Sequence, residues 1–188
     1  MTGLFAAPTV TLTPSPGLSH VLSCDEGPIG WARHSDGPQG FTLRKLLLFI
    51  DKQATSAAQF VVEDTHGTPH YAVFKSQGSA GGFTMQVVDA EQRLIGRATV
   101  ESRHLPGRKI ADVSITDGSG TPVAHLSTTH IPQVYDLQGR PIASWRRRSE
   151  GGAFSGKIYT LVTFEADDLP EWMRALIVGL VLCRDLSY

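Results

Sequence analysis

The stretch FVVEDTHGTPHYAVF, residues Phe60–Phe74, holds the pattern from which the fold can be inferred. At its centre lies the motif Asp-x-x-Gly-x-Pro, which begins at Asp64. Apolar side chains recur at every second position before and after this motif. Such alternation is typical of a β-strand that has one face in a core and the other in water. The stretch therefore predicts two strands joined by a tight turn.

The same motif recurs at Asp117–Pro122 and Asp136–Pro141, and a degenerate copy starts at Asp89, where Gln92 replaces the glycine. The aspartate can accept hydrogen bonds from the backbone amides that follow it. The glycine can take the left-handed conformation that closes a hairpin loop with a bulge. The proline has no amide hydrogen and needs a position outside the hydrogen-bonded ladder. We interpret the aspartates as turn residues, not as a metal or catalytic cluster.

The spacing of the turns indicates how the hairpins are assembled. From Asp64 to Asp89, Asp117 and Asp136 the intervals are 25, 28 and 19 residues. A propeller or solenoid would need a steadier period. Consecutive hairpins at uneven intervals favour a closed or nearly closed antiparallel sheet. Earlier in the chain, the apolar run Phe41–Ile50 fits a short helix or a buried strand, and we favour a strand.

An element of another kind follows the hairpins. The run WMRALIVGLVLC, residues Trp172–Cys183, is apolar except for Arg174. A helix that is apolar on every side must be buried in protein or in lipid. This one would be about 18 Å long, against about 30 Å of hydrocarbon in a bilayer, so we expect a core helix. Asp168, three residues before Glu171, predicts a capping box at its start.

Length and composition favour one domain. The chain has 188 residues, of which 41% are hydrophobic, and a chain of this length can bury a sizeable core. Residues 1–20 contain three prolines and no early positive charge, so they do not read as a secretory signal. We expect them to form an extended or loosely docked arm before a domain of residues 21–188. The two cysteines, Cys24 and Cys183, predict no disulfide framework and favour the cytosol.

Several functional classes find no support in the sequence. A formal net charge of −1 argues against nucleic-acid binding. The chain has no Gly-x-Ser-x-Gly elbow, and the glycine-rich Gly78–Gly82 lacks the lysine of a phosphate-binding loop. The seven histidines show no spacing typical of a metal site. We expect no enzymatic activity, no cofactor, no metal and no nucleic-acid partner.

The densest positive cluster is Trp145-Arg146-Arg147-Arg148. In a strand, Arg146 and Arg148 would share one face and Arg147 the other. Arginine forks suit phosphate, and tryptophan suits the boundary between a membrane and water. The cluster is therefore a candidate site for an anionic headgroup. Solvated strand ends that form salt bridges are the alternative.

A second basic set surrounds the expected turn at Leu105–Gly107 and consists of Arg103, His104, Arg108 and Lys109. Together with the first cluster, these side chains could face one anionic lipid headgroup. The predicted ligand-binding residues are thus Trp145, Arg146, Arg147, Arg148, Arg103, Arg108 and Lys109.

In the order of its hairpins and in its final helix, the chain resembles members of the tubby C-terminal-like superfamily. This superfamily includes the phospholipid scramblases and the LURP-one-related proteins. The resemblance is carried by Phe60–Phe74, Met85–Val100, Val113–Leu126, Val134–Trp145 and Tyr159–Leu186. It implies a mainly β fold, a closed antiparallel barrel of about twelve strands around the buried C-terminal helix. The residues that would fill the barrel are Leu176, Ile177, Leu180 and Val181.

Other features of that superfamily do not carry over. The chain has no cysteine cluster for acylation, and Glu165–Asp168 has three carboxylates without the fuller acidic pattern of scramblases. A calcium site needs six to eight oxygen ligands, so Asp168 is interpreted as a helix cap, and a weak calcium site near it stays open. Tubby proteins bind phosphoinositides through basic surface residues, none of which can be assigned to a position here.

These observations lead to one expected function and two alternatives. We expect a monomeric, non-enzymatic cytosolic binding domain that recognises an anionic phospholipid or phosphoinositide headgroup, peripherally at a membrane. The first alternative is a structural or protein-interaction domain without a lipid role. The second is a scramblase-like membrane protein, which would require the final helix to insert into the bilayer.

Overall fold

The computed structural model describes residues 3–16, 18–34, 58–77, 82–105, 108–127, 131–150 and 157–185. For residues 18, 19, 58, 77, 102–105, 108–111 and 185 it describes the backbone alone. The run Phe41–Ile50, for which we favoured a strand, and most of the glycine-rich Gly78–Gly82 lie outside the described residues.

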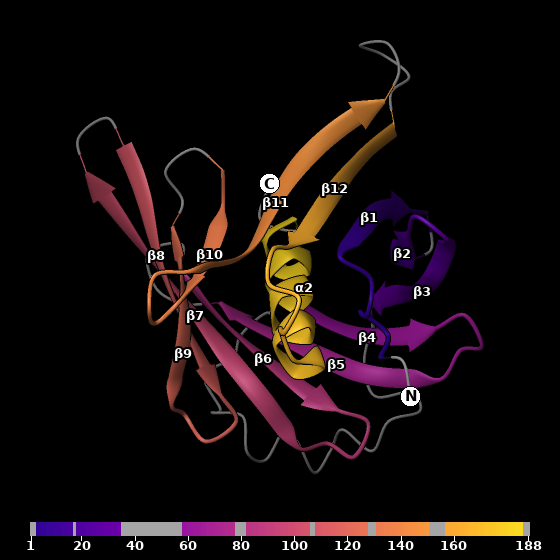
Figure 1. Ribbon diagram of the computed structural model, residues 1–188, viewed down its shortest axis with the longest axis horizontal. Coiled ribbons are helices and arrows are strands. Elements are labelled where there is room, and N and C mark those ends of the chain that lie inside the picture. The colour runs from indigo at the N-terminus through magenta and orange to yellow at the C-terminus, as the bar shows by residue number, and fades with distance from the viewer. Residues whose placement is uncertain are drawn as a thin grey trace.

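The described residues form twelve strands and one helix (Figure 1). The elements are β1 (Thr9–Ser15), β2 (Leu18–Cys24), β3 (Gly27–His34), β4 (Ala58–Asp64), β5 (Pro69–Gln77), β6 (Phe83–Asp89), β7 (Leu94–Leu105), β8 (Arg108–Asp117), β9 (Pro122–Ser127), β10 (Gln133–Asp136), β11 (Pro141–Glu150), β12 (Lys157–Phe164) and α2 (Glu171–Asp185).

The strands form a closed antiparallel barrel in which each strand pairs with its neighbours in sequence. The barrel closes where β1 pairs with β12, with Val10 opposite Val162. This confirms the predicted fold class. The expected arm of residues 1–20 requires a correction, because Thr9–Ser15 is a strand of the wall that pairs with both β12 and β2. The prolines in and beside this strand led us to expect an arm. Pro14 is accommodated in the strand because it lies beside a bulge, where proline is tolerated.

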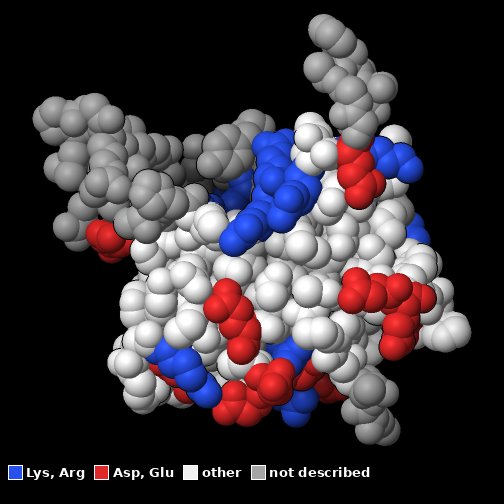
Figure 2. All heavy atoms as spheres, turned by 45° about the horizontal axis from the view of Figure 1, so that its top comes forward, with Lys and Arg blue, Asp and Glu red and all other residues white. Residues whose placement is uncertain are grey.

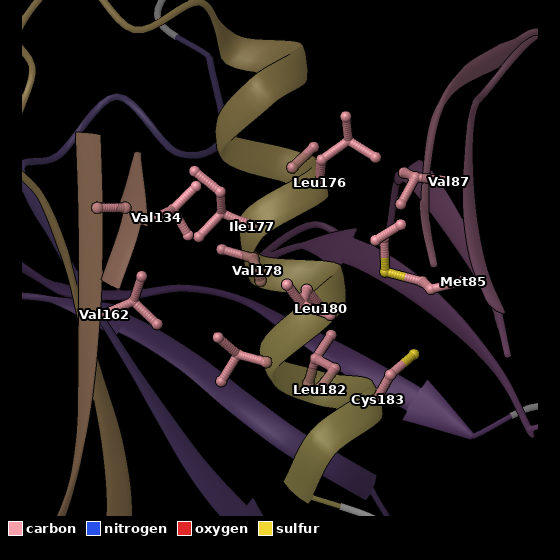
Figure 3. Close-up of a cluster of buried hydrophobic side chains, with 14 of the residues drawn as sticks. Met85, Val87, Val134, Val162, Leu176, Ile177, Val178, Leu180, Leu182 and Cys183 are labelled. Carbon is pink, nitrogen blue, oxygen red and sulfur yellow. The ribbon is translucent and has the colours of Figure 1, made fainter. Parts of the chain in front are cut away.

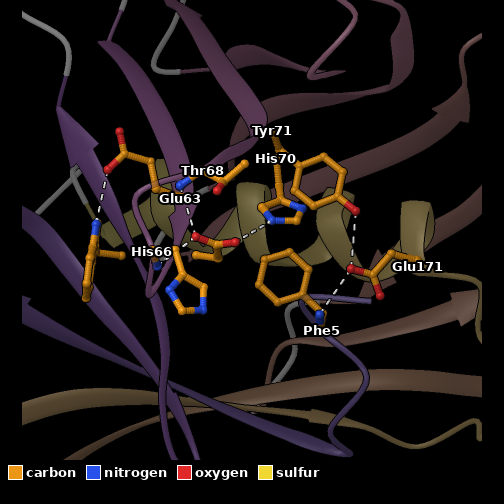
Figure 4. Close-up of polar contacts among 9 residues, drawn as sticks. Phe5, Glu63, His66, Thr68, His70, Tyr71 and Glu171 are labelled. Carbon is orange, nitrogen blue, oxygen red and sulfur yellow. Dashed lines mark hydrogen bonds and ion pairs between the residues drawn. The ribbon is translucent and has the colours of Figure 1, made fainter. Parts of the chain in front are cut away.

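The Asp-x-x-Gly-x-Pro motifs form the predicted hairpin turns. In the first, one carboxylate oxygen of Asp64 accepts hydrogen bonds from the amides of His66 and Thr68, at 2.8 and 2.9 Å (Figure 4). Gly67 closes the turn with a φ of 79°, and the register shifts between Val62 and Glu63, where Glu63 lies opposite Pro69. In the degenerate copy Gln92 takes the same conformation, with a φ of 65°, despite its side chain. The turn is thus fixed mainly by its aspartate.

Hydrogen bonds of this kind lower the pKa values of three turn aspartates, Asp64, Asp117 and Asp136. The amide of Thr68 is the main cause for Asp64, whose pKa falls from 3.8 to about 2. For Asp117 the main cause is the hydroxyl of Ser119. Partial burial opposes the effect at Asp136, but hydrogen bonds from the amide and guanidinium of Arg140 outweigh it.

Acid is therefore expected to weaken the fold as the pH falls from about 4 towards 2. A carboxyl group whose pKa is lower in the folded chain stabilises the fold above its unfolded pKa, and this contribution is lost as the pH falls through its folded pKa. Replacing Asp64 with asparagine should make the melting temperature less dependent on pH in this window. Thermal melts of both proteins between about pH 5 and pH 2 would check this. Parallel curves would contradict it.

Helix α2 fills the barrel, as predicted (Figure 3). Leu176, Ile177, Leu180 and Val181 are at most 1% exposed. At Gly179 the helix lies close to β5 and β6, and an added Cβ would lie 3.1 Å from both the Met85 sulfur and a Val87 methyl carbon. The absence of a side chain there lets the helix fit inside the barrel.

The start of α2 differs from the prediction. The expected capping box does not form, because Asp168 lies in a turn before the helix and its carboxylate accepts from Arg140 at 3.5 Å. The Glu171 carboxylate faces another way, accepting from the amide of Phe5 at 3.0 Å and from the hydroxyl of Tyr71 at 3.2 Å (Figure 4). Glu171 therefore fastens the N-terminal segment to the helix.

The N-terminal segment closes one end of the barrel. Phe5 is 1% exposed and stacks on Tyr71 with 5.9 Å between ring centroids. The guanidinium of Arg174 donates to the carbonyl oxygens of Phe5 and Ala7, both at 3.0 Å, and of Leu169 at 3.0 Å. The charge that seemed out of place in an apolar helix thus has carbonyl partners, as a buried cation requires.

The C-terminal end of α2 is held differently. The ammonium group of Lys75, on β5, donates to the carbonyl oxygen of Cys183 at 2.7 Å and lies 4.6 Å from the centroid of the Phe83 ring. A cation at this position is favourable because helix carbonyls carry partial negative charge at the C-terminus. Burial of Cys183 raises the pKa of its thiol to about 12. Among the residues described, no helix combines the length and the apolar character that a membrane span requires.

Candidate functional site: a basic end of the barrel

The two ends of the barrel differ in charge. At one end, called the turn end here, lie the turns at residues 25–26, 65–68, 90–93, 118–121 and 137–140 and the start of α2. Exposed acidic side chains gather there, among them Asp25, Glu26, Glu91, Glu165, Asp167 and Asp168. In Figure 2 the acidic residues are most numerous in the lower part of the molecule, and a group of basic residues lies above them.

At the opposite end, called the basic end here, two hairpins extend beyond the rest of the wall (Figure 1). The β11–β12 hairpin is paired internally as far as Glu150 and Lys157. However, β11 pairs with β10 only up to Ser144, and β12 with β1 only down to Thr160. Residues 146–150 and 157–159 therefore form a two-stranded projection, called the basic ribbon here.

The basic ribbon carries the cluster predicted from the sequence. Arg146, Arg147 and Arg148 are all exposed. Within the described residues, none of the three forms an ion pair or a side-chain hydrogen bond. The salt bridges that the sequence left open as an alternative are thus not seen in this part of the chain. Three guanidinium groups are available to an external anion.

The strand places these arginines on both faces of the ribbon, as predicted. Inward-facing residues of β11 include Ala143 and Trp145, which are buried. Continued alternation puts Arg147 on this inner face, opposite Thr160 of β12, and Arg146 and Arg148 on the outer face. An anion approaching the outer face meets two arginines, whereas the inner face continues into the mouth of the barrel.

The second basic set lies at the same end of the molecule. Arg103 pairs with Ile110 and Leu105 with Arg108 in the extended β7–β8 hairpin, at the upper left of Figure 1. In the sheet, β9 and β10 separate this hairpin from β11. The positions of the side chains of Arg103, Arg108 and Lys109 lie outside the described part of the structure. The fold brings both sets to one end, which sequence order alone could not show.

Trp145 has a different environment from the one predicted. It is only 7% exposed and lies under the guanidinium of Arg184, with 5.6 Å from the guanidinium carbon to the ring centroid. A membrane-interface tryptophan would have to reach the surface. Trp145 instead links the foot of the basic ribbon to the last turn of α2.

The sequence prediction missed two cations of the basic end, Arg184 and Lys75. Arg184 directly follows the apolar run, where a cation suits a helix C-terminus whatever else it contacts. Lys75 belongs to a strand whose inward face could be inferred from Tyr71 and Val73, four and two residues earlier. Extending that alternation would have placed Lys75 on the inner face.

Comparison with protein-family models, curated proteins and solved structures finds no match for this chain. The geometry of the site is therefore the basis for a functional proposal. In the described part of the chain, no three His, Cys, Asp or Glu side chains are grouped so that they could hold a metal ion.

Proposed function

We propose that this protein is a non-enzymatic binding domain of the tubby-like type, whose basic end recognises an anionic phospholipid headgroup. The observation that carries the proposal is the set of three exposed arginines on the basic ribbon, which have no ion-pair partner among the described residues. A guanidinium presents planar forks that match the oxygens of a phosphate. The outer pair, Arg146 and Arg148, projects at one extreme of the molecule and is accessible to a flat surface.

The distribution of charge supports an orientation on such a surface. The formal net charge is only −1, so the whole molecule gains little from attraction to an anionic membrane. The separation of an acidic turn end from a basic end creates a dipole that turns the basic ribbon towards negative charge. The interaction would act over about 10 Å at moderate salt and weaken as the salt concentration rises.

A second candidate function is a protein-interaction domain. The last backbone contact of β11 with the β10 side is the Trp145 amide, which donates to the carbonyl of Pro132 at 3.2 Å. Beyond it, the described residues provide β11 with no second neighbouring strand. Such an edge can pair with an extended peptide. Scramblase-like insertion has less support, since α2 would have to leave a core in which its apolar residues are buried.

Vesicle co-sedimentation tests the lipid proposal. The protein is expected to bind vesicles containing phosphatidylserine or a phosphoinositide more strongly than neutral phosphatidylcholine vesicles at low salt. Each cation near such a surface contributes about 1 kcal/mol. Replacing Arg146 and Arg148 with alanine should therefore weaken binding by more than about tenfold.

A matched control removes two arginines from the turn end. Arg93 and Arg140 form ion pairs with the turn residues Asp89 and Asp136, at 2.7 and 3.0 Å. Their replacement with alanine changes the net charge by the same amount and should change vesicle binding much less. Equal losses of vesicle binding in both double variants would indicate non-specific electrostatic attraction and no localised binding site. No preference for anionic vesicles would refute the proposal and favour the protein-interaction domain.

A further inference from the structure

Arg184 has an unusual environment on the inner side of the basic ribbon. Its side chain is half-buried in the last turn of α2, and its guanidinium lies over the Trp145 ring. One nitrogen, Nη1, is shut off from solvent and has no hydrogen-bond partner among the described residues. Buried polar atoms in native proteins are nearly always paired, so an exception calls for an explanation such as an unseen ligand.

Arg174, the other arginine of α2, shows which kind of partner Nη1 of Arg184 lacks. Arg174 donates from its Nη1 to the carbonyl oxygens of Phe5 and Ala7 at 3.0 Å. No such acceptor reaches Nη1 of Arg184 in the described part of the chain. Because a guanidinium has only donors, the missing partner must bring acceptor oxygens.

A second arginine follows Trp145 on the same face of the ribbon. Arg147 follows Trp145 by two residues on the inner face of β11, which places it roughly 7 Å further along the strand. Trp145 thus contacts Arg184 on the helix and precedes Arg147 by two residues on the inner face of the ribbon. Neither arginine forms an ion pair with a carboxylate in the described residues. On the other side of the helix end, the ammonium group of Lys75 adds positive charge at the mouth of the barrel.

We propose that Arg147 and Arg184 form an oxyanion site beside Trp145, and that its ligand is a phosphate monoester. A phosphate monoester offers three acceptor oxygens and close to two negative charges at neutral pH, which suits two guanidinium groups. A carboxylate has one charge and two oxygens, so it would bind only one of the two guanidinium groups in a bidentate way. The monoester could belong to a soluble metabolite or to a lipid headgroup. The inference rests on the inner face of the ribbon and is independent of the outer pair, Arg146 and Arg148.

Tryptophan fluorescence provides the first readout. Inorganic phosphate or glycerol phosphate entering the site should change the emission of Trp145 in a saturable way, whereas sodium chloride of equal ionic strength and acetate should not. A Trp145→Phe variant should lose the response, which separates it from Trp31 and Trp172. Arg184→Gln is expected to weaken phosphate binding at least tenfold, and Arg184→Lys by a smaller factor. The double variant Arg146→Ala, Arg148→Ala should bind phosphate with the same affinity as the parent.

Vesicles then distinguish the source of the phosphate. Phosphatidic acid carries a phosphate monoester, and phosphatidylglycerol carries a diester. If the ligand is a headgroup, Arg184→Gln should weaken binding to phosphatidic acid vesicles much more than to phosphatidylglycerol vesicles. If Arg184→Gln weakens glycerol phosphate binding but affects both kinds of vesicle equally, the ligand is a soluble monoester.

Two results would overturn the inference. One is a phosphate response no larger than that to chloride, while anionic vesicles still bind; the proposed function would survive this result. The other is an Arg184→Gln variant that melts at a higher temperature and binds phosphate as the parent does. Arg184 would then be a buried cation without a ligand. A folded Arg147→Gln variant, altered only on the exposed ribbon, tests the site if Arg184→Gln fails to fold.

Discussion

Replacing Arg174 with methionine is expected to lower the free energy of unfolding by about 3 kcal/mol, although methionine is the more apolar residue. Arg174 is 7% exposed, and its guanidinium carbon lies 4.7 Å from the Phe164 ring centroid. Its loss would leave the carbonyl oxygens of Phe5, Ala7 and Leu169 without their donor. A buried acceptor that loses its partner costs more than the hydrogen bond itself contributed. Urea denaturation followed by circular dichroism would measure the change.

Two further variants test which contacts of Arg174 contribute to the free energy of unfolding. Arg174→Lys keeps the charge but cannot reach several carbonyls with one ammonium group, so it should lose somewhat less stability than methionine. In a chain lacking residues 1–7, Arg174→Met should cost clearly less than in the parent. The effects of changes at groups in contact depend on each other in this way, whereas the effects of changes at independent sites add. Equal costs in both backgrounds would show that Arg174 does not act through the N-terminal segment.

Replacing Leu180 with alanine is expected to cost about 2–5 kcal/mol. Leu180 is 0% exposed and lies on the helix that fills the barrel (Figure 3). A closed wall of hydrogen-bonded strands cannot easily collapse onto the lost volume, so the cost should lie towards the upper part of that range. Denaturant titration gives the change, provided the slope of the transition stays the same.

Leu137 provides the matched control for this substitution. It lies in the turn between β10 and β11 and is 60% exposed. Leu137→Ala removes the same atoms from a surface position, where changes are usually within about 0.5 kcal/mol. Similar losses for Leu137→Ala and Leu180→Ala would mean that α2 is not the core of the barrel.

The sequence was most informative where local chemistry decides the structure. The turn aspartates, their glycines and the alternation around them predicted the hairpins, because each turn depends on atoms within a few residues. The burial of Leu176 and Ile177 followed from a helix that is apolar on every side and too short to cross a bilayer. The faces on which Arg146, Arg147 and Arg148 lie could also be inferred, since successive side chains of a strand point to opposite faces.

Long-range contacts could not be inferred from the sequence. Nothing near Val10 indicates that it pairs with Val162, and prolines made the first strand look like an arm. The partners of Arg174 are backbone carbonyls, which carry no sequence signal. Trp145 looked like a surface residue because its neighbours are charged, whereas its own side of the strand faces the helix end. The missing feature in each case is a contact between distant segments.

The position of α2 in the chain has a consequence for biosynthesis. The helix follows all twelve strands, so a ribosome would make every described strand of the wall before the element that fills it. The first strand must also wait for the last, because Thr9 pairs with Thr163. Contacts so distant in sequence make folding slow and leave apolar strand faces exposed meanwhile. The nascent chain is therefore expected to depend on chaperones until α2 emerges.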